Sequence, residues 1–347
     1  APLQIGSRSF LPGESGMVGL EVGHLITHEP VVIPVHVRRG RRSGKAVFIS
    51  AALHGDELNG VEIIRRLLRT KLIRRLRGTL IAVPVVNVPA FAARSRYLPD
   101  RRDLNRLFPG SRSGSLGARL AKAFATEVAR HCDAGIDLHT GAVNRPNLPQ
   151  VRVTAGVDGA RDLAKAFGAP VAIESATRPG SLREMMGDKP LLTYEAGEAL
   201  RLDASAIRFG LRGVLDALRH LGLLPPERNP SPPAKVIFAR DSYWERAPRG
   251  GIFTPLVPLG KAVSPGEPIG FVADPFGGEG GEETRVFPRE EGIVIGRTNQ
   301  AIADEGDGLF HIALTRNPER AERLIRKSGG DLDESEDHPV SDDPLAD

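Results

Sequence analysis

The chain has 347 residues, of which 40% are hydrophobic and 26% charged, a balance that excludes a fibre or a wholly disordered protein. This length suffices for two domains of ordinary size. No apolar run approaches the ~20 residues that a membrane helix needs, and the best candidate, residues 79–93, is broken by two prolines and an asparagine.

The net charge of +4 is unevenly distributed along the chain. Residues 328–347 carry eight acids and neither Lys nor Arg, so the remaining chain is near +12 and can attract anions. Its basic residues are dispersed and aromatic residues make up only 5%, without a nucleic-acid-binding motif. We therefore expect a small acidic substrate as partner, with no nucleic acid and no membrane, and leave a homo-oligomer open. The acidic tail is expected to be disordered.

The N-terminus, APLQIGSRSF, lacks a basic segment followed by an apolar one, so no secretory signal is recognised. Cys132, the one cysteine, has no partner in the chain for a disulfide, as suits a reducing compartment. We expect the protein to be cytoplasmic, although a signal removed earlier would leave secretion open.

Short apolar segments alternate with segments of helical periodicity over the first two thirds of the chain. This order predicts an α/β fold with a mixed, mostly parallel sheet and helices on both faces. The predicted strands are residues 45–53, 79–87, 135–139, 171–174 and 191–195, and the predicted helices are residues 58–77, 116–131, 160–167 and 204–221.

The helix predicted at residues 58–77 carries arginines beside its apolar stripe. A basic helix of this kind can lie on a membrane surface. We favour the alternative, in which the stripe packs on the sheet and the arginines face water.

A proline-rich segment, LPPERNPSPPAK, separates this part from one that lacks helical periodicity and is punctuated by Gly and Pro, as in a small all-β domain. A last helix is expected at residues 318–327. The predicted domains are a catalytic α/β domain at 1–224, a linker at 225–235, a β domain at 236–315, and a terminal helix with the acidic tail at 316–347.

The segment AALHGDELNG (51–60) places His54 after a predicted strand and Glu57 three residues later. An imidazole and a carboxylate at this spacing can bind one zinc ion. Gly55 between them allows a sharp turn. In the alternative, Asp56 caps the following helix and Glu57 faces the helix dipole.

The segment GIDLHTG (135–141) ends a second strand with His139, and Asp137 lies on the same face. His139 would complete a His₂Glu set that leaves a fourth zinc position for water, which is typical of catalytic sites. Asp137 would orient the imidazole. The alternative is a hydrogen-bonded histidine without a metal.

The segment LLTYEAGE (191–198) ends a third strand with Glu195, where open α/β sheets bind their ligands. A carboxylate beside a zinc site can act as general base and acid, or it can simply cap the next segment. Residues 95–110 contribute Arg96 for an oxyanion and the pair Asn105 and Arg106 for a substrate carboxylate, unless these arginines form a solvated loop.

HGDELNG, DLNRLFPG, DLHTG and TYEAG, in this order, resemble the succinylglutamate desuccinylase/aspartoacylase family of the zinc carboxypeptidase superfamily. The resemblance covers roughly residues 20–225. It implies a zinc carboxypeptidase-like fold and one zinc ion per chain, held by His54, Glu57 and His139.

The resemblance also implies that Glu195 is the general base and acid and that Arg96 polarises the scissile carbonyl. Asn105 and Arg106 would hold a substrate carboxylate, and Arg183 matches a further substrate-binding arginine. The second domain is similar to a lipoyl-type barrel-sandwich.

Together, the motifs and the resemblance predict a zinc-dependent hydrolase that cleaves the linear amide bond of an N-acyl amino acid or a related small acidic amide. Two alternatives stay open, namely a metallocarboxypeptidase acting on short peptides and a binding module with a relict site. The acyl group, the amino acid and the pathway are not set by the sequence.

Overall fold

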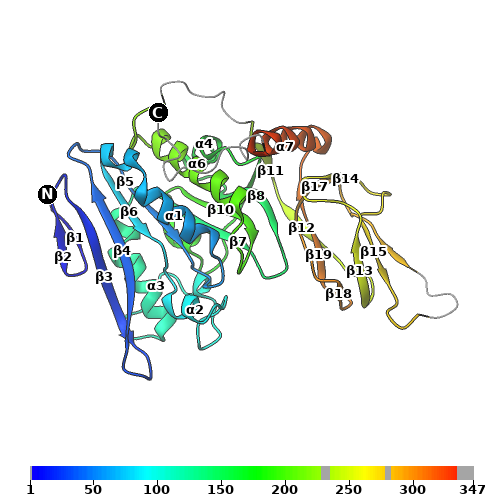
Figure 1. Ribbon diagram of the computed structural model, residues 1–347, viewed down its shortest axis with the longest axis horizontal. Helices are drawn as coiled ribbons and strands as arrows, with labels where there is room; N and C mark the ends of the chain where they lie inside the picture. The colour runs from blue at the N-terminus through cyan, green and yellow to red at the C-terminus, as the bar shows by residue number, and fades with distance from the viewer. Residues whose placement is uncertain (1, 228–234, 278–282, 334–347) are drawn as a thin grey trace.

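A computed structural model describes residues 2–227, 235–277 and 283–333. Most of the predicted proline-rich linker and the part of the acidic tail beyond residue 333 lie outside the described residues. So does the middle of FGGEGGEE (276–283), a glycine-rich segment that predicts a mobile hairpin. Within the described ranges, thirteen strands form one mixed sheet, and a separate four-stranded sheet and a two-stranded hairpin flank it (Figure 1).

The larger part of the mixed sheet belongs to the first two thirds of the chain. Its four central strands run parallel, β3 and β4 extend one edge as an antiparallel pair, and β8 is antiparallel to β10. In sheet order, these strands are β3 (Ser15–His24), β4 (Pro30–Arg39), β6 (Thr79–Val83), β5 (Ala46–Ala51), β7 (Ala134–Gly141), β10 (Leu191–Glu198), β8 (Asn147–Thr154), β9 (Val171–Ser175) and β11 (Ile237–Ala239).

Helices cover both faces of this sheet, as predicted. The long helices α1 (Asn59–Arg69), α4 (Ala160–Phe167) and α6 (Ala204–His220) pack on one face, and α3 (Leu116–Glu127) packs on the other (Figure 1). Shorter elements lie near the sheet ends: α2 (Val88–Ala92), α5 (Leu182–Met186) and the 3-10 turns η1 (Lys71–Arg75), η2 (Leu104–Arg106) and η3 (Ala129–His131).

Strand alternation explains how the central strands can be fully buried and still carry polar groups. In β7, Ile136 and Leu138 point into the core under α1 and α6. Asp137 and His139 therefore point to the opposite face. One sheet face thus holds apolar core, while the carboxyl end of the other face presents polar side chains.

Several predicted elements end earlier than expected. The helix predicted at residues 116–131 stops at Glu127, and the strand predicted at residues 45–53 stops at Ala51. The helix predicted at residues 58–77 stops at Arg69 because Thr70 is extended and its backbone N–H and hydroxyl both donate to Leu67 O. The strand predicted at residues 79–87 ends at Val83, since Pro84 has no N–H to continue the ladder. The apolar stripe of α1 is buried against the sheet, as favoured above.

The later part of the described chain is all-β apart from α7 (Pro318–Asp333), which begins at the predicted proline. The helix does not end at residue 327 as predicted but continues into the first residues of the tail that was expected to be disordered. It has its own apolar core. The strands are β12 (Ser242–Arg246), β13 (Gly251–Pro255), β14 (Ala262–Val263), β15 (Gly270–Ala273), β16 (Thr284–Val286), β17 (Gly292–Arg297), β18 (Ile302–Ala303) and β19 (Gly308–Leu314), and the N-terminal hairpin is β1 (Leu3–Ile5) with β2 (Arg8–Phe10).

The two parts share hydrogen-bonded strands. β17 pairs with β8 at Gly296 and Asn147, and β11 pairs with β9. β11 therefore adds to the first sheet although it follows the linker. The domain boundaries and the likeness of the β region to a barrel-sandwich stay predictions.

Candidate active site

The loop after β5 carries the first two predicted ligands. Ala52, with a φ of 50°, turns the chain out of the strand, and Gly55 passes so close to the backbone at Ala90 that a Cβ there would lie 2.0 Å from its carbonyl carbon. This turn brings His54 Nδ1 within 2.7 Å of Glu57 Oε1. Both side chains are buried.

The alternative reading of this loop, a helix cap, is not observed. Helix α1 begins after Leu58 without a side-chain cap hydrogen bond. Glu57 precedes the helix and points to the two histidines instead of to the first turn of the helix. Asn59 at the start of α1 donates to Ala196 O and accepts from Asp203 N, so it ties this loop to the end of β10.

The end of β7 supplies the third predicted ligand. His139 Nδ1 lies 2.8 Å from the second oxygen of Glu57, and its Nε2 lies 2.6 Å from Asp137 Oδ2. The other oxygen of Asp137 accepts a hydrogen bond of 2.7 Å from Ser50. Asp137 thus orients the ring so that Nδ1 faces Glu57, as predicted from its position two residues before His139.

Asp103 gives His54 a similar partner. Its Oδ1 lies 3.2 Å from His54 Nε2. Arg96 donates to Glu57 at 3.2 Å and to Asp103 at 3.5 Å, so it reaches the same cluster. Asp103 was not among the residues predicted from the sequence, although it is the first residue of the DLNRLFPG motif.

Opposite charges dominate the electrostatics of this cluster. Burial opposes the charged form of each group, yet Glu57 and Asp103 raise the pKa of His54, and Asp137 and Glu57 raise that of His139. The histidines in turn hold the pKa of Glu57 well below its usual range, against its own desolvation. The surroundings of the histidines therefore favour a positive charge.

The three side chains fit a zinc ion. One ligand atom from each of His54, Glu57 and His139 lies within 4.8 Å of the other two, and all three residues are buried. Two imidazoles and one carboxylate are a known catalytic zinc set, and the carboxylates on both distal ring nitrogens are the usual support for such ligands. A divalent cation would replace the protons that this acidic environment favours.

Glu195 lies beside this cluster in the sheet. It pairs with His139 in the parallel β7–β10 register, so both side chains leave the same face of neighbouring strands. Asn147 donates to Glu195 Oε2 at 2.9 Å, and Arg152 Nε donates to Oε1 at 3.0 Å. The structure thus brings the predicted base next to the predicted metal ligands.

The predicted substrate-binding residues lie on two neighbouring segments. Asn105 in η2 accepts from the backbone N–H of Leu182, which begins α5, and Arg106 beside it is exposed. Arg183 in α5 lies near Glu195 and Arg152, whose charges act on it. The roles of these residues in substrate binding stay predictions.

Two residues of this region, Asn147 and Arg152, were missed by sequence reasoning. Both lie in β8, a strand that was not predicted, and Arg152 stands in the unremarkable alternating segment QVRVT. Only the pairing of β8 with β10 reveals that they face Glu195. Tyr243, the one tyrosine of the β region, donates its hydroxyl to the backbone oxygen of Glu290 and accepts from the backbone N–H of the same residue.

The β region contacts the loop after β7 and the end of β10. The N–H of Asn299 donates to Asn144 O at 2.7 Å, and its side chain contacts Glu198 at the end of β10. Trp244 stacks on His311 and lies under Arg145, which follows β7. This part of the chain therefore packs beside the carboxyl ends of β7 and β10.

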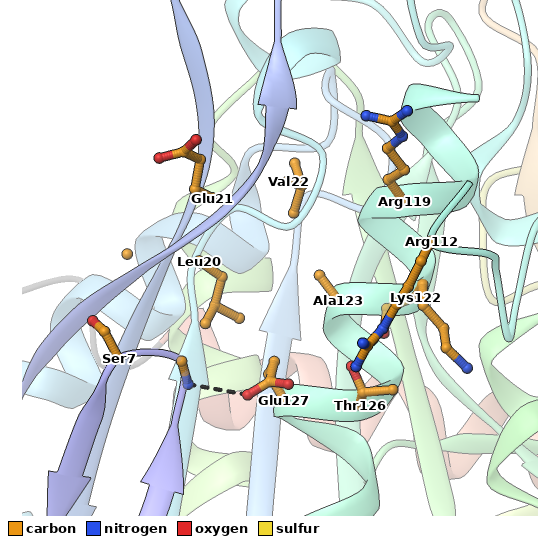
Figure 2. Close-up of a pocket in the computed structure, with 12 residues that line it drawn as sticks. Ser7, Leu20, Glu21, Val22, Arg112, Arg119, Lys122, Ala123, Thr126 and Glu127 are labelled. Atoms are coloured by element: carbon orange, nitrogen blue, oxygen red, sulfur yellow. Dashed lines mark hydrogen bonds between the residues drawn. The ribbon is translucent and has the colours of Figure 1, made fainter. Parts of the chain in front are cut away.

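A separate hollow of about 570 Å³ lies between β3, the N-terminal hairpin and α3 (Figure 2). Arg112, Arg119 and Lys122 line it on the α3 side, and Glu127 accepts a hydrogen bond from Gly6 N at its base (Figure 2). None of the predicted site residues lines this hollow.

Comparisons with known proteins agree with the predicted resemblance. The family described as the succinylglutamate desuccinylase/aspartoacylase catalytic domain matches residues 43–221, more than half of the chain. The N-alpha-acetyl-L-2,4-diaminobutyric acid deacetylase of Halomonas elongata is 28% identical over 296 residues, which cover 82% of this chain and 86% of that protein. A succinylglutamate desuccinylase of Burkholderia cenocepacia is 36% identical over 107 residues, 27% of this chain and 30% of its own.

Solved structures of similar proteins share the fold. The product-bound ectoine utilization protein EutE (DoeB) of Ruegeria pomeroyi matches with a TM-score of 0.79 and 26% identity, covering 91% of this chain and 98% of that one. A succinylglutamate desuccinylase/aspartoacylase of Rhodobacter sphaeroides matches with a TM-score of 0.77 and 25% identity, covering 88% and 95%. No helix in the described ranges is long and apolar enough to cross a membrane.

Proposed function

We propose that this chain, which belongs to the succinylglutamate desuccinylase/aspartoacylase family, is a zinc-dependent amidohydrolase that cleaves the linear amide bond of a small acidic N-acyl amino acid. One observation carries the proposal: the buried cluster of His54, Glu57 and His139 lies next to Glu195 on one face of the sheet. The similar deacetylase of Halomonas elongata, named for an N-acetyl amino acid, supports the substrate class.

His54, Glu57 and His139 would hold the zinc ion, with Asp103 and Asp137 orienting the two imidazoles. When bound, zinc supplies Lewis-acid chemistry, which polarises a carbonyl oxygen and makes water more acidic. The three ligands leave a coordination position open, as catalytic zinc sites require.

Glu195 would move the proton in the reaction. Its carboxylate takes a proton from the attacking water, and the same oxygen then delivers that proton to the departing amine nitrogen. Asn147 orients this carboxylate through the hydrogen bond to Oε2.

Arginines would bind the negative charges of the substrate and of the reaction. Arg96, held between Glu57 and Asp103, can donate to the oxyanion that develops on the scissile carbonyl. Asn105 and Arg106 would bind the carboxylate of the amino acid, with Arg183 as a further contact.

The cytoplasm stays the predicted location. Cys132 is buried, and burial raises the pKa of its thiol well above the usual range. The thiol is therefore poorly reactive.

The proposal is tested by a substrate panel on zinc-loaded protein: N-acetylaspartate, N-succinylglutamate, N-acetyl-2,4-diaminobutyrate and a set of dipeptides. We expect hydrolysis of at least one N-acyl amino acid and of none of the dipeptides. Cleavage of dipeptides alone would favour a carboxypeptidase. A protein that binds one zinc ion per chain and hydrolyses no compound of a broadened panel would favour a binding module.

A further inference from the structure

The chain that connects β7 to β8 is held by the β region. The backbone N–H of Asn299 donates to Asn144 O at 2.7 Å. The backbone N–H of Arg297 donates to Pro146 O at 3.3 Å. The next residue, Asn147, begins β8 and pairs with β17. The later part of the chain therefore holds both this connection and the first residue of β8.

Gly296 is the residue of β17 that faces Asn147. A Cβ on Gly296 would lie only 2.8 Å from Oδ1 of Asn147, while the next neighbours are His311 Cβ at 3.2 Å and Pro146 O at 3.7 Å. The φ of Gly296 is not positive, so the backbone conformation does not call for a glycine. The missing side chain thus makes room above all for the amide group of Asn147.

The two ends of this amide group face different parts of the chain. Oδ1 of Asn147 lies against Gly296, and Nδ2 donates to Glu195 Oε2 at 2.9 Å. Because the amide group is planar and rigid, a displacement of Oδ1 also moves Nδ2. Hydrogen bonds weaken steeply when their geometry is lost. Arg152 holds the other oxygen of Glu195 at 3.0 Å, so without Asn147 the carboxylate can turn about that contact.

We propose that Gly296 and Asn147 are positioning residues, through which the β region sets the direction of the Glu195 carboxylate. The proposal rests on the proposed function, because it treats Glu195 as the general base. Neither residue needs to touch the substrate, since both act through Glu195. The β region thereby takes part in the proposed reaction although it supplies no reacting group.

The substitution Gly296→Ala isolates this contact. The atom that the new Cβ would meet first is Oδ1 of Asn147, the end of a side chain that can rotate, so the backbone can stay in place. The proposed zinc ligands and substrate-binding residues supply none of the three nearest atoms. We therefore expect zinc content and KM close to those of wild type. The value of kcat should fall, because a misplacement of about 1 Å can cost about 100-fold in rate.

The first experiment needs no turnover and follows the side-chain amide of Asn147 by NMR, in zinc-loaded protein with ¹⁵N-labelled asparagine. Its signal is identified as the one that Asn147→Ser removes. Wild type, Gly296→Ala and Glu195→Ala are compared with the control Gly19→Ala, whose Cβ would lie 2.5 Å from a methyl group of Val32 at the far edge of the sheet. We expect Gly296→Ala to shift the signal in the same direction as Glu195→Ala, and the control to leave it in place. A signal that either of these two variants leaves at the wild-type position would overturn the proposal.

The second experiment is a double-variant cycle in kcat on the best substrate of the panel. It uses wild type, Gly296→Ala, Asn147→Ala, the double variant and the control Gly19→Ala. We expect each of the first two variants to lower kcat about tenfold or more. The double variant should lie within about twofold of Asn147→Ala, because the glycine acts through that side chain. A wild-type kcat in Gly296→Ala, or an equal further loss from it in the absence of Asn147, would overturn the proposal.

Zinc content and thermal unfolding of each variant establish that the fold is intact. Any loss of thermal stability in Gly296→Ala should be recovered in the double variant, where no amide group meets the new methyl group.

The two experiments separate this proposal from the proposed function. A wild type that hydrolyses no N-acyl amino acid, with the Asn147 signal coupled to Gly296 and Glu195 as predicted, would refute the hydrolysis and leave the positioning contact supported. A wild type that hydrolyses one, with the Asn147 signal and kcat both unaffected by Gly296→Ala, would refute the positioning role and leave the hydrolysis supported.

Discussion

Asp137 offers a sharp test of how the protein supports its proposed zinc ligands. It is almost fully buried and lies between Ser50 at 2.7 Å and His139 Nε2 at 2.6 Å. Asp137→Asn keeps the shape of the side chain: its amide oxygen still faces His139, and Ser50 can turn to accept from its NH₂. The substitution therefore removes mainly the negative charge.

The size of the effect follows from this geometry. A hydrogen bond to a charged group contributes about 1.5–3 kcal/mol and a neutral one about 1 kcal/mol. The lost difference of about 0.5–2 kcal/mol corresponds to roughly 2–30-fold weaker zinc binding, which overlaps the lower part of the range of about 10–100-fold typical of such outer residues. Asp137→Ala would in addition leave buried polar groups unpaired and destabilise the metal-free protein by about 1–3 kcal/mol.

Competition with a chromogenic chelator measures the zinc affinity, and denaturant unfolding measures stability. Asp162→Asn is the matched control, because Asp162 is an exposed acid that pairs with Lys165 on α4. We expect wild-type zinc affinity in this control. If the zinc affinity of Asp137→Asn lay within twofold of the wild-type value, the claim that the charge of Asp137 strengthens zinc binding by His139 would be refuted.

Three further predictions concern separate parts of the molecule. Glu195→Ala should lower kcat by about 10²–10⁴-fold with zinc content unchanged, and near-normal turnover would remove Glu195 from the mechanism. Gly55→Ala should destabilise the protein by about 1–3 kcal/mol in denaturant unfolding, because its Cβ would lie 2.0 Å from Ala90, and a neutral effect would refute this close approach. Burial lowers the pKa of His311 to about 3, so the unfolded chain takes up a proton below pH ~6.5 that the folded chain does not. Wild type should therefore lose about 2 kcal/mol of stability between pH 7 and 5 that His311→Gln does not lose, and parallel pH profiles would contradict this.

The sequence predicts most of the catalytic half because its signals are local. Helix α4 begins and ends where predicted, since Gly159 and Gly168, both with positive φ, bound a clear apolar stripe. His54 and His139 are recognisable because each stands in a chemically distinctive motif, His54 just after a buried apolar strand and His139 near the end of one. The parallel order of β5 and β7 then brings them together.

The rest depends on contacts that the local pattern does not contain. Arg152 resembles any polar residue of an alternating strand, and only the register between β8 and β10 sets it against Glu195. The end of α1 at Thr70 is decided by hydrogen bonds to Leu67 within an otherwise continuous helical stripe. The pairing of β11 with β9 joins segments about 65 residues apart, beyond the reach of any periodicity.

The central claim, a zinc ion held by His54, Glu57 and His139, is tested most directly by elemental analysis. Wild type and His54→Ala are purified side by side without added metal, and each is measured again after reconstitution with zinc and removal of the excess. We expect about one zinc ion per chain in wild type and little in the variant. Equal zinc in both proteins, or a wild type that does not retain zinc after reconstitution, would contradict the claim.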